Sequence, residues 1–449
     1  MGRHDKPDST NTGQGGSAGG DGQDPKKHGS EPLPHPVRRR HGPQPVTTPG
    51  ARLARALTIA GHIIAPRWHR AILAVDRAGF IPGTVWVTSN DHPGYYVPVT
   101  REDPDHARWT HEDYALATQV DDGAPAGGPN GEPGWGRLRT SSLSQPSLVV
   151  DMLQQLDAAE GHRVLEIGTG TGYNTALLCH SLGEKAVVSA EIDPELARIA
   201  VDNLDRAGYR PTVLDQDGTG HLGTGLGADR FHRVISTVAA RGSIPHSWVR
   251  QTWPGGVIVT PWEVGTRPGV LVRLEVAEDD TAHGRIVGEA PFMVLRSQRP
   301  DSRRIRDLVD EDDPGKQAGT TTVNPRLVAY EHPGWQLVLG HLVPGLRYAV
   351  YEASEERPEC AGEASVYVAT PDGSWALGEY TPTGGPYVTE RAGGRDLWAE
   401  VGAAWEAWER AGRPGREQLG VTVDAEGTRL WAGSPDGVLR PLGATAKGG

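Results

Sequence analysis

The sequence is poor in cysteine and contains no long apolar run. Its 449 residues include only Cys179 and Cys360, so a disulfide framework and a cysteine-rich metal site are both excluded. No apolar run approaches the roughly 20 residues that cross a bilayer, and the polar stretch Met1–Gly20 lacks the apolar centre of a signal peptide. We therefore expect a cytoplasmic protein without a metal site.

Basic residues are also in short supply. The chain has 45 Lys and Arg against 57 Asp and Glu, which gives a net charge of −12. Because phosphate groups attract cations, we expect no general binding to nucleic acid or to an anionic membrane. Glycine (60) and proline (36) are abundant instead and indicate many loops, while 37% apolar residues still suffice for hydrophobic cores.

Composition divides the chain into four segments. Residues 1–50 have almost no large apolar side chains, so they cannot offset their ordering entropy and are expected to be disordered. Residues 51–298 are predicted to form the main domain. The charged residues 299–320 are interpreted as a linker, and residues 321–449 as a smaller α+β domain that helps to recognise a substrate. The oligomeric state leaves no signal in the sequence.

Within the main domain, apolar runs alternate with helical stretches. The pattern predicts an α/β fold with a doubly wound, mainly parallel, Rossmann-like sheet. Its N-terminal part, residues 51–143, is predicted to be helical and loop-rich, and Asp121–Gly136 to be a long mobile loop with the role of a lid or a binding loop. The strands are expected at 164–167, 186–190, 211–214, 233–236 and 257–260, with later antiparallel strands at 270–276 and 291–295.

The smaller domain has its own local signals. Pro371–Gly373 and Ala425–Gly427 lie between runs of alternating residues and predict two β-hairpins. Between them, an apolar stripe from Leu397 to Trp408 predicts a helix with one buried face. These elements indicate a folded unit with a core rather than a tail.

The strongest chemical signal is a glycine-rich turn after the strand at 164–167. Glycine permits positive φ and lets the backbone approach a ligand closely. The spacing is Gly-x-Gly-x-Gly, with Glu166 two residues before the first glycine, and differs from a dinucleotide fingerprint, whose phosphates need bare helix N–H groups. S-adenosylmethionine has no phosphate and fits better. The predicted cofactor contacts in and just before this turn are Glu166, Gly168, Thr169, Gly170 and Gly172.

Two further acidic positions follow at the ends of predicted strands. Glu191, with Ile192 after it, comes about 20 residues beyond the glycine turn, where an acid can bind both ribose hydroxyls. Asp217 and Gly218 end another strand, where an acid can meet the adenine amine. An isolated glycine turn is as often a plain strand–helix connection, but three elements in this order favour a cofactor site.

These residues carry a resemblance to a known family. The segments VLEIGTGTGYNTALL, AEIDPELA and DQDGTG resemble class I S-adenosylmethionine-dependent methyltransferases, and most of all the protein-L-isoaspartate O-methyltransferases. Ser142–Pro146 (SLSQP) resembles the element with which that family holds the substrate carboxyl, and Val75–Pro82 resembles its N-terminal element. The resemblance covers about residues 51–297 and implies an enzyme that uses S-adenosylmethionine to methylate aspartate or isoaspartate in a peptide or protein.

The resemblance also implies roles for single residues. Ser144 would donate to the substrate carboxylate, Ser142 would assist through its hydroxyl, and Gln145 belongs to the same substrate-binding element. Arg241 stands where the family has proline, and it is equally well explained as a substrate contact or as an ordinary surface arginine. A carboxylate has a reference pKa near 4 and is already nucleophilic at neutral pH, so a catalytic base is not needed.

The substrate itself is left open between alternatives. Leu116–Asp121 together with SSLSQPSLVVDML resembles a bacterial branch of the family found with peptide maturation systems of the graspetide and lanthipeptide kind. That likeness implies methylation of an aspartate in a ribosomally made, cyclised peptide, whose ester then closes to an aspartimide. Housekeeping repair of isoaspartate in damaged proteins is the alternative. A non-catalytic peptide-binding protein with a relict cofactor site is a third hypothesis.

Overall fold

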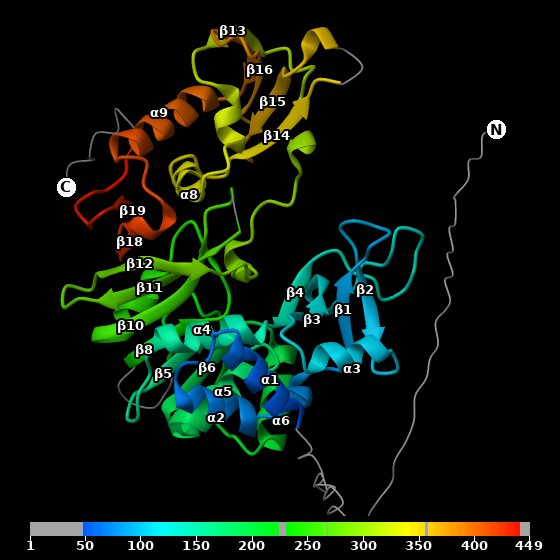
Figure 1. Ribbon diagram of the computed structural model, residues 1–449, viewed down its shortest axis with the longest axis vertical. Coiled ribbons are helices and arrows are strands. Elements are labelled where there is room, and N and C mark those ends of the chain that lie inside the picture. The colour runs from blue at the N-terminus through cyan, green and yellow to red at the C-terminus, as the bar shows by residue number, and fades with distance from the viewer. Residues whose placement is uncertain (1–47, 224–229, 267, 355–357, 441–449) are drawn as a thin grey trace, which may run out of the picture. The chain divides into compact units, whose positions relative to one another are not determined.

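The computed structural model describes residues 48–223, 230–266, 268–354 and 358–440 (Figure 1). The segment predicted to be disordered, 1–50, lies almost entirely outside these residues. No helix in the described ranges is both long and apolar enough to cross a membrane. The described residues belong to one compact unit.

A parallel sheet forms the centre of the fold, as predicted. The chain leaves the central strand β5, adds two strands on one side, and then returns to add β8 and β10 on the other. Ligands of doubly wound sheets bind at the carboxyl ends of the strands where the order reverses in this way. The strands, in spatial order, are β7 (Thr212–Asp215), β6 (Val187–Glu191), β5 (Val164–Ile167), β8 (Phe231–Ser236) and β10 (Thr252–Glu263).

The two faces of this sheet bury different partners, because side chains alternate along a strand. Val164 and Val187 face one core, which contains residues of α1, α2, α4 and α5. Leu165 and Val188 face the other core, which contains residues of α7 and of the C-terminal region. The helices of this part are α1 (Pro49–Ile59), α2 (Pro66–Ala74), α4 (Pro146–Leu156), α5 (Tyr173–Leu182), α6 (Pro194–Arg206) and α7 (His246–Arg250).

Beyond β10 the sheet continues with antiparallel strands. The strand expected at 270–276 is confirmed as β11 (Val270–Val276). The prediction of a strand at 291–295 was wrong, because Val294 makes only an isolated bridge to Ala239. The sequence prediction missed β12, which contains glycines; a Cβ at Gly284 would lie 1.8 Å from the carbonyl oxygen of Arg273. The remaining strands are β9 (Ala240–Arg241), β12 (Ala282–Glu289), β18 (Leu419–Asp424) and β19 (Gly427–Ala432).

The C-terminal region contains a five-stranded antiparallel sheet with α9 alongside it (Figure 1). Both predicted hairpins are present, as β15–β16 and β18–β19, and the predicted helix is α9. Trp398 of this helix donates its indole N–H to the Leu377 carbonyl. The sheet and its helices are β13 (Gln317–Thr321), β17 (Tyr387–Ala392), β16 (Trp375–Tyr380), β15 (Ala364–Ala369), β14 (Arg347–Glu352), α8 (Pro333–Leu342) and α9 (Leu397–Arg410).

The structure places part of a β-strand within the predicted linker 299–320. Its last residues belong to β13, which pairs with β17. The C-terminal hairpin also extends the central sheet, since β18 pairs with β12, and Trp335 and Trp408 share one hydrophobic core with Val234. The division into two domains and the linker between them therefore stay predictions, with the end of that linker belonging to β13.

A small four-stranded sheet carries the loop predicted at 121–136. This loop is fastened at its base, because the Asp121 carboxylate accepts hydrogen bonds from the backbone N–H groups of Ala126, Arg137 and Leu138. The elements of this part are β2 (Tyr96–Thr100), β1 (Thr84–Thr88), β3 (Leu116–Val120), β4 (Arg139–Leu143) and α3 (Pro104–Thr110). Short 3-10 helices complete the described chain at Arg77–Phe80, Asp121–Gly123, Glu184–Ala186, Arg296–Gln298, Ile305–Asp307, Pro325–Ala329, Pro358–Cys360 and Arg416–Gln418.

Candidate active site

A cavity of about 500 Å³ lies at the carboxyl ends of β5, β6 and β7. This volume falls within the range of small-molecule sites. The cavity is also the place where the sheet topology predicts a ligand. Of the site residues predicted from sequence, those that line it are Ser142, Gly168, Gly170, Glu191, Ile192, Asp217 and Gly218.

The glycine turn forms the floor of this cavity because side chains do not fit there. Gly168 has φ +90°, and a Cβ on it would lie 2.8 Å from the Thr237 hydroxyl. Its N–H donates to the Ala190 carbonyl over 2.8 Å, and its own carbonyl accepts from the Thr237 hydroxyl. Gly172 has φ +96° and is the N-cap of α5. Thr169 is buried outside the cavity, against the Ser189 hydroxyl.

Glu191 links the turn to the next strand. Its carboxylate accepts hydrogen bonds from the backbone N–H of Gly170 (2.8 Å) and of Asp193 (3.1 Å). Burial raises the pKa of this carboxyl above its ordinary value, although the two N–H donors oppose the rise. The acid therefore fixes the turn and at the same time presents oxygen atoms to the cavity.

Glu166 lies beneath the turn and does not line the cavity. It is fully buried and accepts from Asn174 Nδ2 (2.7 Å), Thr175 Oγ1 (2.5 Å) and Ser189 Oγ (2.7 Å). Burial raises the pKa of its carboxyl. These bonds fasten β5 to α5 and β6, so the position of Glu166 is that of a support for the turn. A direct cofactor contact for Glu166 stays a prediction.

Asp217 and Gly218 close the cavity after β7. The Asp217 carboxylate accepts from the backbone N–H and the hydroxyl of Thr219, both at 2.9 Å. Gly218 packs on β5, since a Cβ there would lie 2.6 Å from Ile167 Cγ2, and its carbonyl accepts from the indole of Trp248. The close approach explains why this position has no side chain.

The predicted substrate element reaches the cavity through its first serine. Ser142 of β4 lines the cavity, as does its neighbour Ser141, which the sequence reasoning missed. A Cβ on Gly170 would lie 3.7 Å from Ser141 Oγ and 3.9 Å from the Ser142 carbonyl. Ser144 follows the end of β4 and is outside the cavity lining.

Gln145 and Arg241 are engaged elsewhere. The Gln145 amide donates to the Asp113 carboxylate (2.9 Å) and the Ser147 hydroxyl (3.0 Å). Arg241 does not line the cavity, and its guanidinium pairs with Glu263, which does. Their substrate contacts remain predictions, because neither side chain reaches the cavity wall in this state.

The opposite wall was missed by the sequence reasoning. It consists of Arg139 on β4, the segment from Phe292 to Arg296, and Arg299 to Ser302. Part of this wall was expected to be a strand and part a linker. The sequence signal that could have indicated this wall is the apolar run 291–295, which is followed by the closely spaced Arg296 and Arg299.

Comparisons with known proteins agree with the site. The Protein-L-isoaspartate(D-aspartate) O-methyltransferase family matches residues 136–299. A protein-L-isoaspartate O-methyltransferase from Methanopyrus kandleri is 30% identical over 246 residues, 54% of this chain and 89% of that protein. One from Pyrobaculum islandicum is 30% identical over 48% of this chain and 84% of that protein. The chain belongs to this family.

Membership of the protein-L-isoaspartate O-methyltransferase family makes the chain a methyltransferase that uses S-adenosylmethionine as cofactor. Other relatives match over a shorter part: the one from Methanosarcina mazei is 34% identical over 34% of this chain, and the match spans 62% of its own length. A solved protein-L-isoaspartate O-methyltransferase aligns with 86% of this chain and 100% of its own at 19% identity and a TM-score of 0.48.

The residues present fit the cofactor of this methyltransferase family. Glu191 and Asp217 offer carboxylates, which accept hydrogen bonds from hydroxyl and amine groups. Ile192, Leu196 and Phe292 add apolar wall, suited to an adenine ring. Within the described ranges, no group of three or more His, Cys, Asp or Glu side chains is placed to hold a metal ion.

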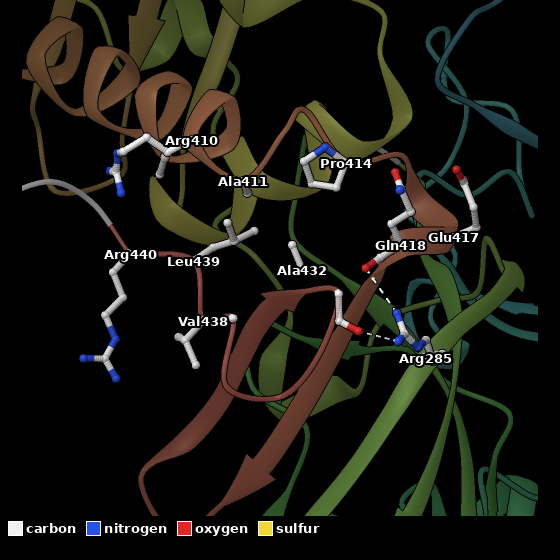
Figure 2. Close-up of a pocket in the computed structure, with 13 residues that line it drawn as sticks. Arg285, Arg410, Ala411, Pro414, Glu417, Gln418, Ala432, Val438, Leu439 and Arg440 are labelled. Carbon is white, nitrogen blue, oxygen red and sulfur yellow. Dashed lines mark hydrogen bonds between the residues drawn. The ribbon is translucent and has the colours of Figure 1, made fainter.

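A second cavity of about 600 Å³ lies near the end of the described chain (Figure 2). Figure 2 shows Arg285 on one side of it, with its guanidinium donating to the carbonyl oxygens of Gln418 and Gly433. Arg410 and Arg440 also line it, together with Leu439. None of the residues predicted to bind cofactor or substrate lies there, so the first cavity is the candidate active site.

Proposed function

We propose that this chain transfers a methyl group from S-adenosylmethionine to the free carboxylate of an aspartate or isoaspartate in a peptide or protein: the side-chain carboxylate of aspartate, or the α-carboxylate that isoaspartate leaves free. One observation carries the proposal. A single cavity joins the glycine turn and Glu191 to Ser142, the first serine of the predicted substrate element. Cofactor and carboxyl group would thus meet in one place in a chain of this family.

The reaction needs alignment more than acid–base chemistry. A carboxylate with a reference pKa near 4 is ionised at neutral pH, and the bound cofactor supplies an activated methyl group. The carboxylate oxygen would take this methyl group, with an O–C bond formed as the C–S bond is broken and the electron pair of that bond left on sulfur. Holding the oxygen in line with this bond is a proximity effect worth several kcal/mol, roughly.

The chain's own residues would provide this alignment. Glu191 and Asp217 would accept from the cofactor's hydroxyl and amine groups, and the glycine turn would leave room for it. Ser142, beside Gly170, would donate its hydroxyl to the substrate carboxylate. Ser144 remains a predicted partner of that carboxylate, although its side chain is outside the cavity lining.

The ester would then close without further help from the enzyme. The backbone nitrogen of the next residue attacks the ester carbonyl carbon, its proton passes to the departing methoxide, and methanol leaves. The product is a five-membered succinimide. In an isoaspartyl protein this is a repair step, whereas in a cyclised peptide it yields the aspartimide.

One feature favours a dedicated peptide substrate as the finer form of the proposal. The C-terminal region, absent from the matched family segment 136–299, extends the central sheet through β18. Residues 300–302, which follow that segment, also line the cavity. A region so joined to the catalytic sheet is suited to recognising a particular substrate. Repair of isoaspartate in damaged proteins remains the second candidate.

The test compares three peptides under the same conditions. An isoaspartyl peptide, its aspartyl counterpart and a cyclised peptide precursor are each incubated with the chain and S-adenosylmethionine and followed by mass spectrometry. We expect a gain of one methyl group and then a loss of methanol. Preference for the cyclised precursor supports the dedicated function, and preference for the isoaspartyl peptide supports repair. No methylation of any peptide contradicts the proposal.

A matched pair of variants ties the activity to the cavity. Glu191→Gln keeps the size of the side chain but removes its charge, and we expect kcat/KM to fall by about 10-fold or more, as for the loss of a hydrogen bond to a charged group. Glu195→Gln changes an exposed acid in the first turn of α6 and should leave kcat/KM unchanged. Equal values for both variants would exclude Glu191 from the site.

A further inference from the structure

Two arginines of the cavity wall converge on one carboxylate. Arg299 donates to both oxygens of Asp122 through Nη1 (2.7 Å) and Nη2 (2.8 Å). Arg296 Nη2 lies 3.1 Å from Asp122 Oδ1. Two parallel N–H···O bonds are the geometry with which arginine recognises a carboxylate. Both arginines line the cavity, so a carboxylate is already bound at the edge of the candidate active site.

Arg296 is held in place independently of this carboxylate. Its Nη2 also lies 3.1 Å from Asp193 Oδ2, and Asp193 is the N-cap of α6. Gln119 donates to the same carboxylate over 3.1 Å and accepts from the Thr140 hydroxyl over 2.8 Å. Arg296 would therefore keep its position if Asp122 moved away.

Arg299 has no such anchor. Among the described residues, Asp122 is its one acidic partner, and this partner lies at the surface: 42% of the Asp122 side chain is exposed, against 27% for Arg299. Hydrogen bonding to Arg299 lowers the pKa of the Asp122 carboxyl. Because the Asp122 carboxylate is partly open to solvent, which weakens an ion pair, a competing carboxylate can take the place of Asp122.

Asp122 has a backbone conformation that is unfavourable for most residues other than glycine. It has φ +53° inside the short helix Asp121–Gly123. Left-handed geometry is uncommon outside glycine, although aspartate tolerates it better than most residues. The Asp122 N–H donates to the Thr140 hydroxyl (3.1 Å), so the loop offers its carboxylate to the arginines from a fixed base.

We propose that Arg299, oriented beside Arg296, is a carboxylate-binding residue for the peptide substrate, and that Asp122 occupies its site until an acidic side chain next to the methylated residue replaces it. This inference rests on the proposed function and adds a substrate class to it: peptides with Asp or Glu beside the methyl-accepting residue. Asp122 acts as an internal competitor. An exchange of one carboxylate for another leaves the charge of the cavity wall unchanged.

The experiment uses the full chain and two capped isoaspartyl peptides that differ only in one neighbour, Glu or Gln. Capping removes the terminal carboxylate as a second source of the same group. For the unmodified chain we expect kcat/KM to be about 10-fold higher for the Glu peptide, through KM, as for one charge-assisted pair. Arg299→Gln should bring this ratio close to one.

A second variant should act in the opposite direction. Asp122→Asn removes the competitor and should raise kcat/KM for the Glu peptide several-fold, again through KM. Arg198→Gln is the matched control, because Arg198 also pairs with two carboxylates but lies on the exposed side of α6; its peptide ratio should equal that of the unmodified chain. A change in kcat alone would indicate a structural effect rather than binding.

Several results would overturn the inference. A ratio near one for the unmodified chain, or an unchanged ratio in Arg299→Gln, excludes a substrate role for Arg299. Weaker binding of S-adenosylhomocysteine to this variant, with the ratio unchanged, would assign Arg299 to the cofactor carboxylate instead. If neither peptide is methylated, the proposed function fails, and fluorescence anisotropy of the labelled peptides with S-adenosylhomocysteine present still decides whether Arg299 selects the Glu peptide.

Discussion

The two walls of the candidate active site are built on different physical principles. One wall consists of glycines at the ends of β5 and β7 and of the buried Glu191 at the end of β6, with Glu166 beneath the glycine turn. Burial raises the pKa of both glutamate carboxyls. The other includes the partly buried arginines Arg296 and Arg299, and hydrogen bonding to Arg299 lowers the pKa of Asp122. The first wall is fixed by backbone geometry, and the second by ion pairs that solvent weakens. Under the proposed function, the first wall together with Phe292 would hold the cofactor, and the arginines of the second wall would meet the substrate.

The sharpest way to break the first wall is to add one methyl group. Gly168→Ala introduces a side chain at φ +90° with its Cβ 2.8 Å from the Thr237 hydroxyl. We expect it to lower the free energy of unfolding by about 2–4 kcal/mol and to abolish measurable binding of S-adenosylhomocysteine by calorimetry. Gly161→Ala is the control, because Gly161 has φ +85° but open space around its Cβ position. Equal effects of the two would show that backbone strain alone is responsible.

The support under that wall should be nearly as sensitive. Glu166→Ala leaves the donors of Asn174, Thr175 and Ser189 without their acceptor, and buried unsatisfied donors cost about 1–3 kcal/mol each. We expect a loss of about 3 kcal/mol in unfolding free energy, measured by denaturant titration. Glu195→Ala, at an exposed site, should stay within about 0.5 kcal/mol. A neutral result for Glu166→Ala would contradict its assignment as a support.

The smallest effect should appear in the pH dependence, with opposite signs for the two walls. Because burial raises the folded-state pKa of Glu191, the chain should lose stability relative to Glu191→Gln as pH rises from about 4.5 through that pKa, by at most about 1.4 kcal/mol per pH unit. The pKa of Asp122 is lowered, so its contribution should be present above about pH 4 and lost below it. Unfolding curves from pH 3 to 8 with Glu191→Gln and Asp122→Asn test both signs.

Local sequence patterns predicted the first wall but only part of the second. The glycine turn, Glu191 and Asp217 each lie at or just beyond the end of a strand. Parallel strands bring their carboxyl ends to one edge, so their meeting was predictable. Glu166 matched the same motif yet lies under the turn, because alternate residues of a strand face opposite sides. The motif did not indicate on which side of β5 its carboxylate would lie.

The substrate element shows the same limit at the other wall. Sequence reasoning placed Ser142 and Ser144 at the substrate. Ser142 lines the cavity together with Ser141, which was missed, whereas Ser144 lies outside the lining because β4 ends at Leu143 and the chain then enters α4. The contact between Asp122 and Arg299 could not be predicted from a sequence pattern. The two residues are far apart in the chain, one in a predicted loop and the other in the predicted linker.

The amino-acid sequence by itself determined the alternation of strands and helices from β5 to β10, the glycine turn and the acids at the ends of β6 and β7. These features depend on local backbone preferences and on the alternation of apolar residues, which act over a few neighbouring positions. The tertiary structure alone decided which carboxylates face the cavity, that β18 completes the central sheet, and that two arginines meet Asp122. Those outcomes depend on packing between distant segments, and no short stretch of sequence contains that information.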